Sequence, residues 1–195
     1  MKKDIILSGV GGQGILSIAA VIGEAALAAG LHIKQAEVHG MSQRGGDVHS
    51  NLRISPEPIH SDLIARGGAD LIISLEPMEA LRYLPWLSRE GWIVTSSAPT
   101  VNIPNYPDHE ALLSELGGLE RVILFDADAV AREADVARAA NIVLLGAASV
   151  VLGLDMKGLQ SAVGRVFGRK GDAVVEMNLR ALETGYKTGL IRAKI

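Results

Sequence analysis

Hydrophobic and polar positions follow two different periods along the first quarter of the chain. Residues 5–7 form a short apolar run that ends in a glycine cluster, and residues 15–29 then follow a helical spacing closed by Gly30. Residues 33–38 predict a second strand. Residues 48–54 alternate strictly, which predicts a strand with one polar face. The apolar-side positions are Val48, Ser50, Leu52 and Ile54, and the polar-side positions are His49, Asn51 and Arg53.

Beyond residue 68, apolar strands alternate with helical stretches until the last third of the chain, which predicts helices alone. Such alternation is typical of helices packed on a sheet. We therefore expect a single domain over residues 1–195 with a three-layer α/β/α fold, a mixed and mainly parallel sheet, a Rossmann-like start and a helical C-terminal portion. The predicted elements are a short extended piece 59–64, strands 69–75, 92–95 and 122–125, helices 76–84, 108–116, 127–134, 138–152 and 157–167, and a last helix 172–187 with Asp172 as its N-cap.

The composition narrows the classes of function. The chain has 195 residues, 22 glycines and no cysteine. Without cysteine it can form no disulfide and offer no thiolate to zinc or an iron–sulfur cluster, so a redox metal would have to lie on a partner. A formal charge of −3 gives no basic surface of the kind that binds nucleic acid.

Two apolar segments bear on cellular location. Lys2 and Lys3 precede an apolar run as in a secretory signal, but Asp4 and Gln13, together with the glycines, interrupt it. The longest apolar run, residues 142–154, contains glycine and is shorter than the roughly 18 residues that span a bilayer. The sequence therefore predicts a cytoplasmic protein without a membrane span.

A glycine-rich turn joins the first strand to the first helix, and its residues include Gly9, Gly11, Gly12, Gln13 and Gly14. The spacing matches G-x-G-x-x-G, and Glu37 falls where a dinucleotide-binding fold places its ribose-binding acid. Glycines let the backbone approach a phosphate, and a helix N-terminus attracts anions. The same glycines also suit a tight turn with close helix–strand packing, so phosphate binding and a purely structural role both stay open.

A nicotinamide-binding unit requires more than this turn. Its second strand must be followed by a helix that crosses over to a third, parallel strand. Residues 39–47 are too few for such a crossover. The strands on either side of them are therefore expected to be antiparallel neighbours, which weighs against an NAD(P)-binding Rossmann oxidoreductase.

The connecting loop carries its own candidate binding residues, namely Ser42, Gln43, Arg44, Gly45 and Gly46. A guanidinium beside unhindered backbone amides suits an anionic group or a contact with another subunit. A solvated hairpin turn accounts for the same residues, so these uses stay open. No histidine pair has metal-ligand spacing, no Ser/His/Asp set can be assigned, and the catalytic residues stay unknown.

Two stretches together resemble a known family. GVGGQGIL at residues 9–16 and EVHGMSQRGG at residues 37–46 are similar to the gamma-type domain of the 2-oxoacid:ferredoxin oxidoreductases. Further similarity lies in ADLIISLEPMEALRYLPWL at residues 69–87, in the proline-bearing loop 98–107 and in the helical tail, so the resemblance covers nearly the whole chain. The wording VHGMSQ favours the indolepyruvate branch over those for pyruvate, 2-oxoglutarate or branched-chain 2-oxoacids.

The resemblance implies oxidative decarboxylation of an aryl 2-oxoacid such as indolepyruvate, with coenzyme A and oxidised ferredoxin, to aryl-acetyl-CoA, carbon dioxide and reduced ferredoxin. It places thiamine diphosphate and the iron–sulfur clusters on a large alpha subunit, so this chain would hold no cofactor and be inactive alone. It also implies that the gamma-type domain helps form the coenzyme A side of the site, with Arg44 near the cofactors or at the subunit interface. A CoA- or nucleotide-binding module without catalysis stays open, and the isolated chain is expected to self-associate through the face that its partner covers.

Overall fold

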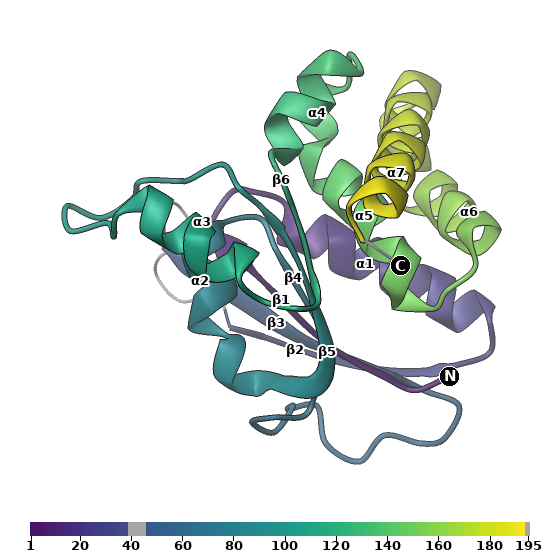
Figure 1. Cartoon of the computed structure of the whole chain (residues 1–195). Helices are drawn as coiled ribbons and strands as arrows, with labels where there is room; N and C mark the ends of the chain where they lie inside the picture. The colour runs from purple at the N-terminus through teal and green to yellow at the C-terminus, as the bar shows by residue number, and fades with distance from the viewer. Residues whose placement is uncertain (39–45, 194–195) are drawn as a thin grey trace.

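Six strands form one mixed sheet in the computed structural model, which describes residues 1–38 and 46–193 (Figure 1). The strands are β1 (Lys3–Val10), β2 (His32–Val38), β3 (Asp47–Ser55), β4 (Ala69–Ser74), β5 (Leu87–Ser96) and β6 (Val122–Phe125). Their order across the sheet is β2-β3-β1-β4-β5-β6. The pairs β1–β4, β4–β5 and β5–β6 are parallel, whereas β3 is antiparallel to both β1 and β2.

The strand that follows the predicted hairpin is inserted between the first two strands. β2 and β3 are antiparallel neighbours, with Val38 opposite His49, as the short connection predicted. β3 also pairs with β1, from Lys3 opposite Ile54 to Val10 opposite Asp47. In a dinucleotide-binding fold the first two strands lie side by side. Here β3 separates them.

The larger helical layer covers one face of the sheet (Figure 1). Leu7 and Leu71 of the sheet and Ile22 of the first helix are fully buried in this interface. Each such side chain contributes roughly 1.5–3 kcal/mol. In the described part of the chain, no helix is both long and apolar enough to cross a bilayer. The helices are α1 (Ile15–Ala28), α5 (Ala140–Leu152), α6 (Met156–Phe167) and α7 (Asp172–Arg192), with α4 (Ala127–Glu133) beside α5.

The opposite face carries a smaller layer made of α2 (Pro77–Arg82), α3 (His109–Gly117) and a 3-10 turn, Leu84–Trp86. Because side chains alternate along a strand, Ile6 and Ile72 point to this face and pack with Leu116 of α3. The two cores on either side of the sheet confirm the predicted three-layer α/β/α arrangement.

The polar face of β3 fixes the loop that leads to β4. Arg53 Nε and Nη2 donate to the Asp4 carboxylate at 2.8 and 3.0 Å, and Nη1 donates to the Ser61 carbonyl at 3.0 Å. The Ile64 N–H donates to Asn51 Oδ1 at 3.2 Å. The strict alternation in this strand thus separates an apolar core face from a face of internal hydrogen bonds.

Several local expectations differ from the structure. The prediction that Asp172 caps α7 was wrong, because Gly171 occupies the cap position and no side chain caps the helix. Residues 59–64 form no strand; their backbone is irregular and joins β3 to β4. β5 begins at Leu87, before the predicted strand, because Leu87 pairs with Ala69 ahead of a bulge.

Candidate functional site

The carboxyl ends of the parallel strands bring the two glycine-rich segments together at one edge of the sheet. The Gly11 N–H donates to the Gly46 carbonyl at 2.8 Å, so the base of the β2–β3 hairpin lies beside the glycine turn. In open α/β sheets, ligands bind in the crevice at this edge. We call it the carboxyl edge; it comprises residues 10–14, 46–48, 74–76 and 96–108.

Two glycines of the turn adopt a left-handed backbone that side chains disfavour. Gly12 has a φ of 103° and Gly14 a φ of 85°. A Cβ on Gly14 would stand 2.6 Å from Asn141 Nδ2, which itself donates to the Gly14 carbonyl at 3.1 Å. Gly14 thus lets α1 start close against α5. Among the described residues, nothing lies within 4 Å of a Cβ on Gly12.

The side chain of Gln13 joins the end of β1 to the end of β4. Its Oε1 accepts the Val10 N–H at 2.7 Å, and its Nε2 donates to the Leu75 carbonyl at 3.2 Å and to the Thr100 hydroxyl at 3.0 Å. A Cβ on Gly9 would stand 2.6 Å from that Oε1, so Gly9 leaves the room that the amide needs. Dinucleotide-binding folds place a pyrophosphate at this turn. In this chain, the Gln13 side chain instead links the turn to the end of β4.

Three amides near the turn already donate within the chain. They belong to Val10, Gly11 and Gln13, the last of which bonds to the Val10 carbonyl at 3.1 Å. An anion at this turn would therefore bind the amides of Gly12, Gly14 and the first turn of α1. No side chain caps that helix, and its dipole favours negative charge at this end.

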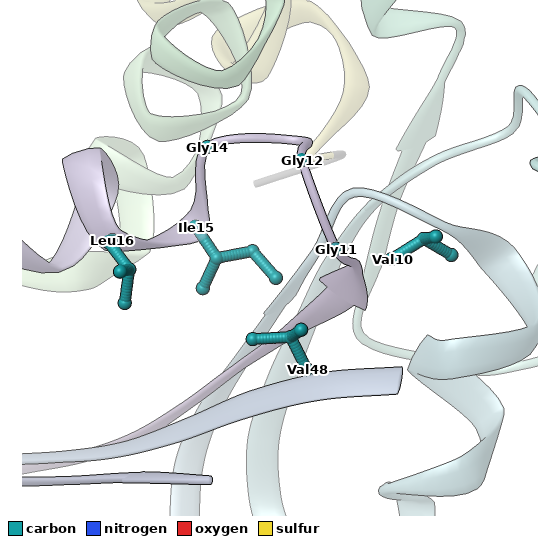
Figure 2. A pocket seen from close by; sticks show the side chains of 7 residues that line it. All are labelled: Val10, Gly11, Gly12, Gly14, Ile15, Leu16 and Val48. Carbon is teal, nitrogen blue, oxygen red and sulfur yellow. The ribbon is translucent and has the colours of Figure 1, made fainter. Parts of the chain in front are cut away.

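A cavity of about 340 Å³ opens beside the turn (Figure 2). Ile15 and Leu16 line it from α1 and Val48 lines it from β3, and 48% of Leu16 is exposed. Apolar walls beside backbone amides suit a group with an apolar body and a polar end. The full lining is Val10, Gly11, Gly12, Gly14, Ile15, Leu16 and Val48.

Glu76 is a fully buried carboxyl group directly after β4. Its Oε2 accepts the Glu79 N–H at 2.8 Å and so caps α2, while its Oε1 accepts the Thr100 N–H at 3.4 Å and the Tyr106 hydroxyl. Burial, together with the bond to Glu76, raises the pKa of the Tyr106 phenol, which therefore stays protonated as a donor. These donors compensate for the burial of the carboxyl group. One side chain thus joins β4, α2 and the loop over residues 97–108.

A second group of titratable side chains lies at the base of the hairpin. The Tyr83 hydroxyl is 3.3 Å from Asp47 Oδ2, and the Tyr83 ring centroid is 4.9 Å from that of His49. Burial lowers the pKa of His49 against the charge of Asp47, so this imidazole is neutral at pH 7. Burial also raises the pKa of Glu79; the hydrogen bond from Arg82 Nε at 2.7 Å opposes that shift. Side chains of this kind can transfer protons, but a role in catalysis requires a substrate atom within hydrogen-bond reach, and the structure shows no such atom.

The structure brings only part of the predicted site together. Gly46 and the glycine turn meet at the carboxyl edge, whereas Ser42, Gln43, Arg44 and Gly45 lie outside the described residues. Glu37 lies on the outermost strand, where its Oε1 accepts from Gln35 Nε2 at 2.6 Å. Because β3 separates that strand from β1, Glu37 does not take the place of a ribose-binding acid.

Sequence reasoning missed the buried polar residues of this edge. Glu76 precedes Pro77 at a helix start, so its sequence context indicates no more than a cap. Tyr106 lies in a proline-bearing loop, where an aromatic residue has no periodic signal. Their pairing depends on a contact between segments 30 positions apart.

Metal-ligating side chains are not clustered in the part of the chain that the structure describes. In residues 1–38 and 46–193, no three His, Cys, Asp or Glu side chains are placed to hold a metal ion. The complete sequence has no cysteine. Iron–sulfur clusters are held by thiolates, so the residues present do not fit such a cluster.

The chain is similar to known proteins along nearly its whole length. A family model described as pyruvate ferredoxin/flavodoxin oxidoreductase matches residues 4–188. Indolepyruvate oxidoreductase subunit IorB of Archaeoglobus fulgidus is 34% identical over 97% of this chain and 96% of its own length. The IorB of Thermococcus kodakarensis is 36% identical over 96% of each protein.

A longer relative and a solved structure extend the comparison. Ketoisovalerate oxidoreductase subunit VorA of Methanothermobacter thermautotrophicus is 29% identical over 92% of this chain, which corresponds to 35% of that subunit. The gamma subunit of a keto/oxoacid ferredoxin oxidoreductase from Geobacter sulfurreducens superposes with a TM-score of 0.72 and 26% identity, covering 97% of this chain and 99% of that one. The chain therefore belongs to the pyruvate ferredoxin/flavodoxin oxidoreductase family.

Proposed function

We propose that this chain is the beta, gamma-type subunit of an indolepyruvate:ferredoxin oxidoreductase. The observation that carries the proposal is its 34% and 36% identity, over almost the full length, to two proteins named indolepyruvate oxidoreductase subunits. The complex would convert an aryl 2-oxoacid, coenzyme A and oxidised ferredoxin into aryl-acetyl-CoA, carbon dioxide and reduced ferredoxin. The ketoisovalerate relative is 29% identical, which favours the indolepyruvate branch over the branched-chain one.

In this proposal a large alpha subunit holds thiamine diphosphate and the iron–sulfur clusters. The absence of cysteine supports that division, because this chain can supply no thiolate. The small subunit would then bind and position, and would be inactive alone. Ferredoxin would act through the assembled complex, which we place in the cytoplasm.

The carboxyl edge is the part of the chain that we propose faces coenzyme A and the large subunit. The bond between Gly11 and Gly46 supports this role, because it brings both family motifs to one place beside an apolar cavity. Gly12 and the first amides of α1 would face the ligand, while Gln13 supports the turn from within. Arg44, flanked by Ser42, Gln43, Gly45 and Gly46, is proposed to lie near coenzyme A or at the subunit interface.

Two other functions make different predictions. An NAD(P)-binding oxidoreductase is disfavoured because β3 separates β1 from β2 and because Gln13 bridges the crevice. A CoA- or nucleotide-binding module without catalysis would bind its ligand as an isolated chain and need no partner. Fluorescence titration of the isolated chain with NAD(H), NADP(H) and coenzyme A separates these cases.

Reconstitution with the large subunit of the same organism tests the proposal directly. Neither chain alone should reduce ferredoxin with indolepyruvate and coenzyme A, and the mixture should do so faster than with pyruvate or 2-oxoglutarate. Arg44→Ala should raise the KM for coenzyme A or weaken assembly. Arg44→Lys, which keeps the charge but loses the planar donor fork, should lie between wild type and Arg44→Ala. An assembled complex without indolepyruvate activity would refute the function.

A further inference from the structure

The loop over residues 97–108 joins β5 to α3 without regular structure, yet it is fixed at its start. The Ser97 N–H donates to the Phe125 carbonyl at 2.9 Å, and His109 Nε2 donates to the Ser97 carbonyl at 2.8 Å. The start of the loop is therefore tied to both β6 and α3.

The middle of the loop is held by side chains from two other segments. Thr100 accepts from Gln13 Nε2 at 3.0 Å and donates its N–H to Glu76, and the Tyr106 hydroxyl donates to the same carboxyl group. Glu76 is fully buried. The glycine turn and the end of β4 therefore both determine where this loop lies.

Residues 97–107 of the loop, which precede the exposed helix cap Asp108, lack charge and include an apolar tip. Residues 97–107 read SAPTVNIPNYP and contain no Asp, Glu, Lys or Arg, in a chain of which 21% is charged. Val101 is 70% exposed, and Pro99, Pro104 and Pro107 are also exposed. Depletion of charge is typical of the centre of a protein–protein interface. The loop over residues 56–68 at the opposite edge has the exposed residue Leu63 but also carries charged side chains.

From these observations we propose that the loop over residues 97–108 is a pre-formed docking surface for the large subunit, with Val101 as its central apolar contact. This inference rests on the proposed function. The occupant is indicated by the VorA relative, in which the matching segment is 35% of a longer subunit, so the domain is joined there to further protein. A loop fixed before binding loses less conformational entropy when it binds.

Gln13 and Glu76 act in this proposal as positioning residues. Neither is required to touch the partner, because each holds the loop through Thr100 or Tyr106. Tyr106→Phe removes one hydrogen bond while keeping the ring. It should weaken subunit binding several-fold and also lower the thermal stability of the isolated chain, because the buried Glu76 carboxyl group loses a donor. Binding is therefore compared at a temperature where both the variant and the wild type are folded.

The test measures the dissociation constant of the two full-length subunits by isothermal titration calorimetry. Val101→Asp should weaken binding about tenfold or more, as expected for a central contact. Val101→Lys should weaken it similarly, because either charge would be buried. The matched control Leu63→Asp, at a position 60% exposed on the charged loop, should stay near the wild-type value. Circular dichroism of each variant checks that it is folded.

Three outcomes would overturn the docking surface. The first is that both Val101 variants bind the large subunit with wild-type affinity. The second is that one introduced charge weakens this binding while the other strengthens it. The third is that Val101→Asp abolishes self-association of the chain but leaves its affinity for the large subunit unchanged. If instead the wild-type chain does not bind the large subunit at all, the proposed function fails together with the inference. Failure of the docking surface alone leaves an active wild-type complex, so the two failures are distinguishable.

Discussion

Replacing Gly185 by alanine should force α7 away from α5. A Cβ at Gly185 would stand 2.7 Å from the Val143 carbonyl carbon and closer still to its oxygen, and 3.0 Å from the Ala147 nitrogen. Gly189, one turn later, faces the same helix, where a Cβ would stand 2.6 Å from the Ala147 carbonyl oxygen. Carbon atoms pack at about 3.5–4.0 Å, so the helices would have to separate by roughly 1 Å. Because the obstructing atoms are backbone, no rotamer change can relieve the overlap.

The expected loss of stability follows from two opposing terms. Overpacking of a core costs about 3 kcal/mol at the upper end of the usual range, whereas alanine in place of a helical glycine returns about 1 kcal/mol. The net loss is therefore about 2 kcal/mol, which lowers the midpoint of urea unfolding by about 1 M for an m value of about 2 kcal/mol/M. Gly164→Ala on α6 is the matched control, because nothing described lies within 4 Å of a Cβ there. It should raise the midpoint slightly. If Gly185→Ala unfolds at a urea concentration equal to or above that of wild type, close contact between α5 and α7 does not limit the stability of this core.

Three further predictions concern the sheet and its carboxyl edge. Burial lowers the pKa of His49 below its ordinary 6.5, so the free energy of unfolding should fall as the pH drops from 6.5 through the pKa of the folded state. His49→Gln should flatten that part of a profile of melting temperature against pH. An unchanged slope would contradict the assignment of this pH dependence to His49. Arg53→Gln should cost about 3 kcal/mol in urea unfolding, because the buried Asp4 carboxylate loses two guanidinium hydrogen bonds and keeps only the exposed Lys2 ammonium at 3.6 Å. A loss below about 1 kcal/mol would mean that Lys2 or water replaces the guanidinium. Gly14→Ala should lose roughly 2 kcal/mol, more than Gly12→Ala, because both meet backbone strain but only Gly14 also meets Asn141; equal losses would leave the helix contact without effect.

Local pattern predicted most of the strands and helices, because each element has its own period and its own end signals. The short connection over residues 39–47 also predicted that the strands flanking it are antiparallel. It could not predict that β3 enters the sheet between β1 and β2. β3 pairs with the edge of β1 opposite to β4, and no local residue pattern reports which edge a strand takes. Glu37 was misplaced for this reason.

The buried polar groups of the carboxyl edge could not be predicted from the sequence for a related reason. Glu76 looks like an exposed helix cap until Tyr106 and Thr100 cover it, and both belong to an irregular loop. Burying a carboxyl group is favourable only where donors meet it. Those donors come from the tertiary arrangement of β4 and the loop after β5, which periodicity does not describe.

The glycine turn shows why its motif alone did not identify a ligand. In a dinucleotide-binding fold, the glycines provide a tight turn, an approach for the pyrophosphate and close helix packing. Here Gly14 keeps the packing role against Asn141, whereas Gly9 makes room for the side-chain amide of Gln13. That amide satisfies the Val10 N–H and bonds to the end of β4, so a residue at a variable position of the motif bridges the crevice. In this chain, the glycine spacing thus supports an internal contact through Gln13, and the cavity open to a ligand lies beside Gly12.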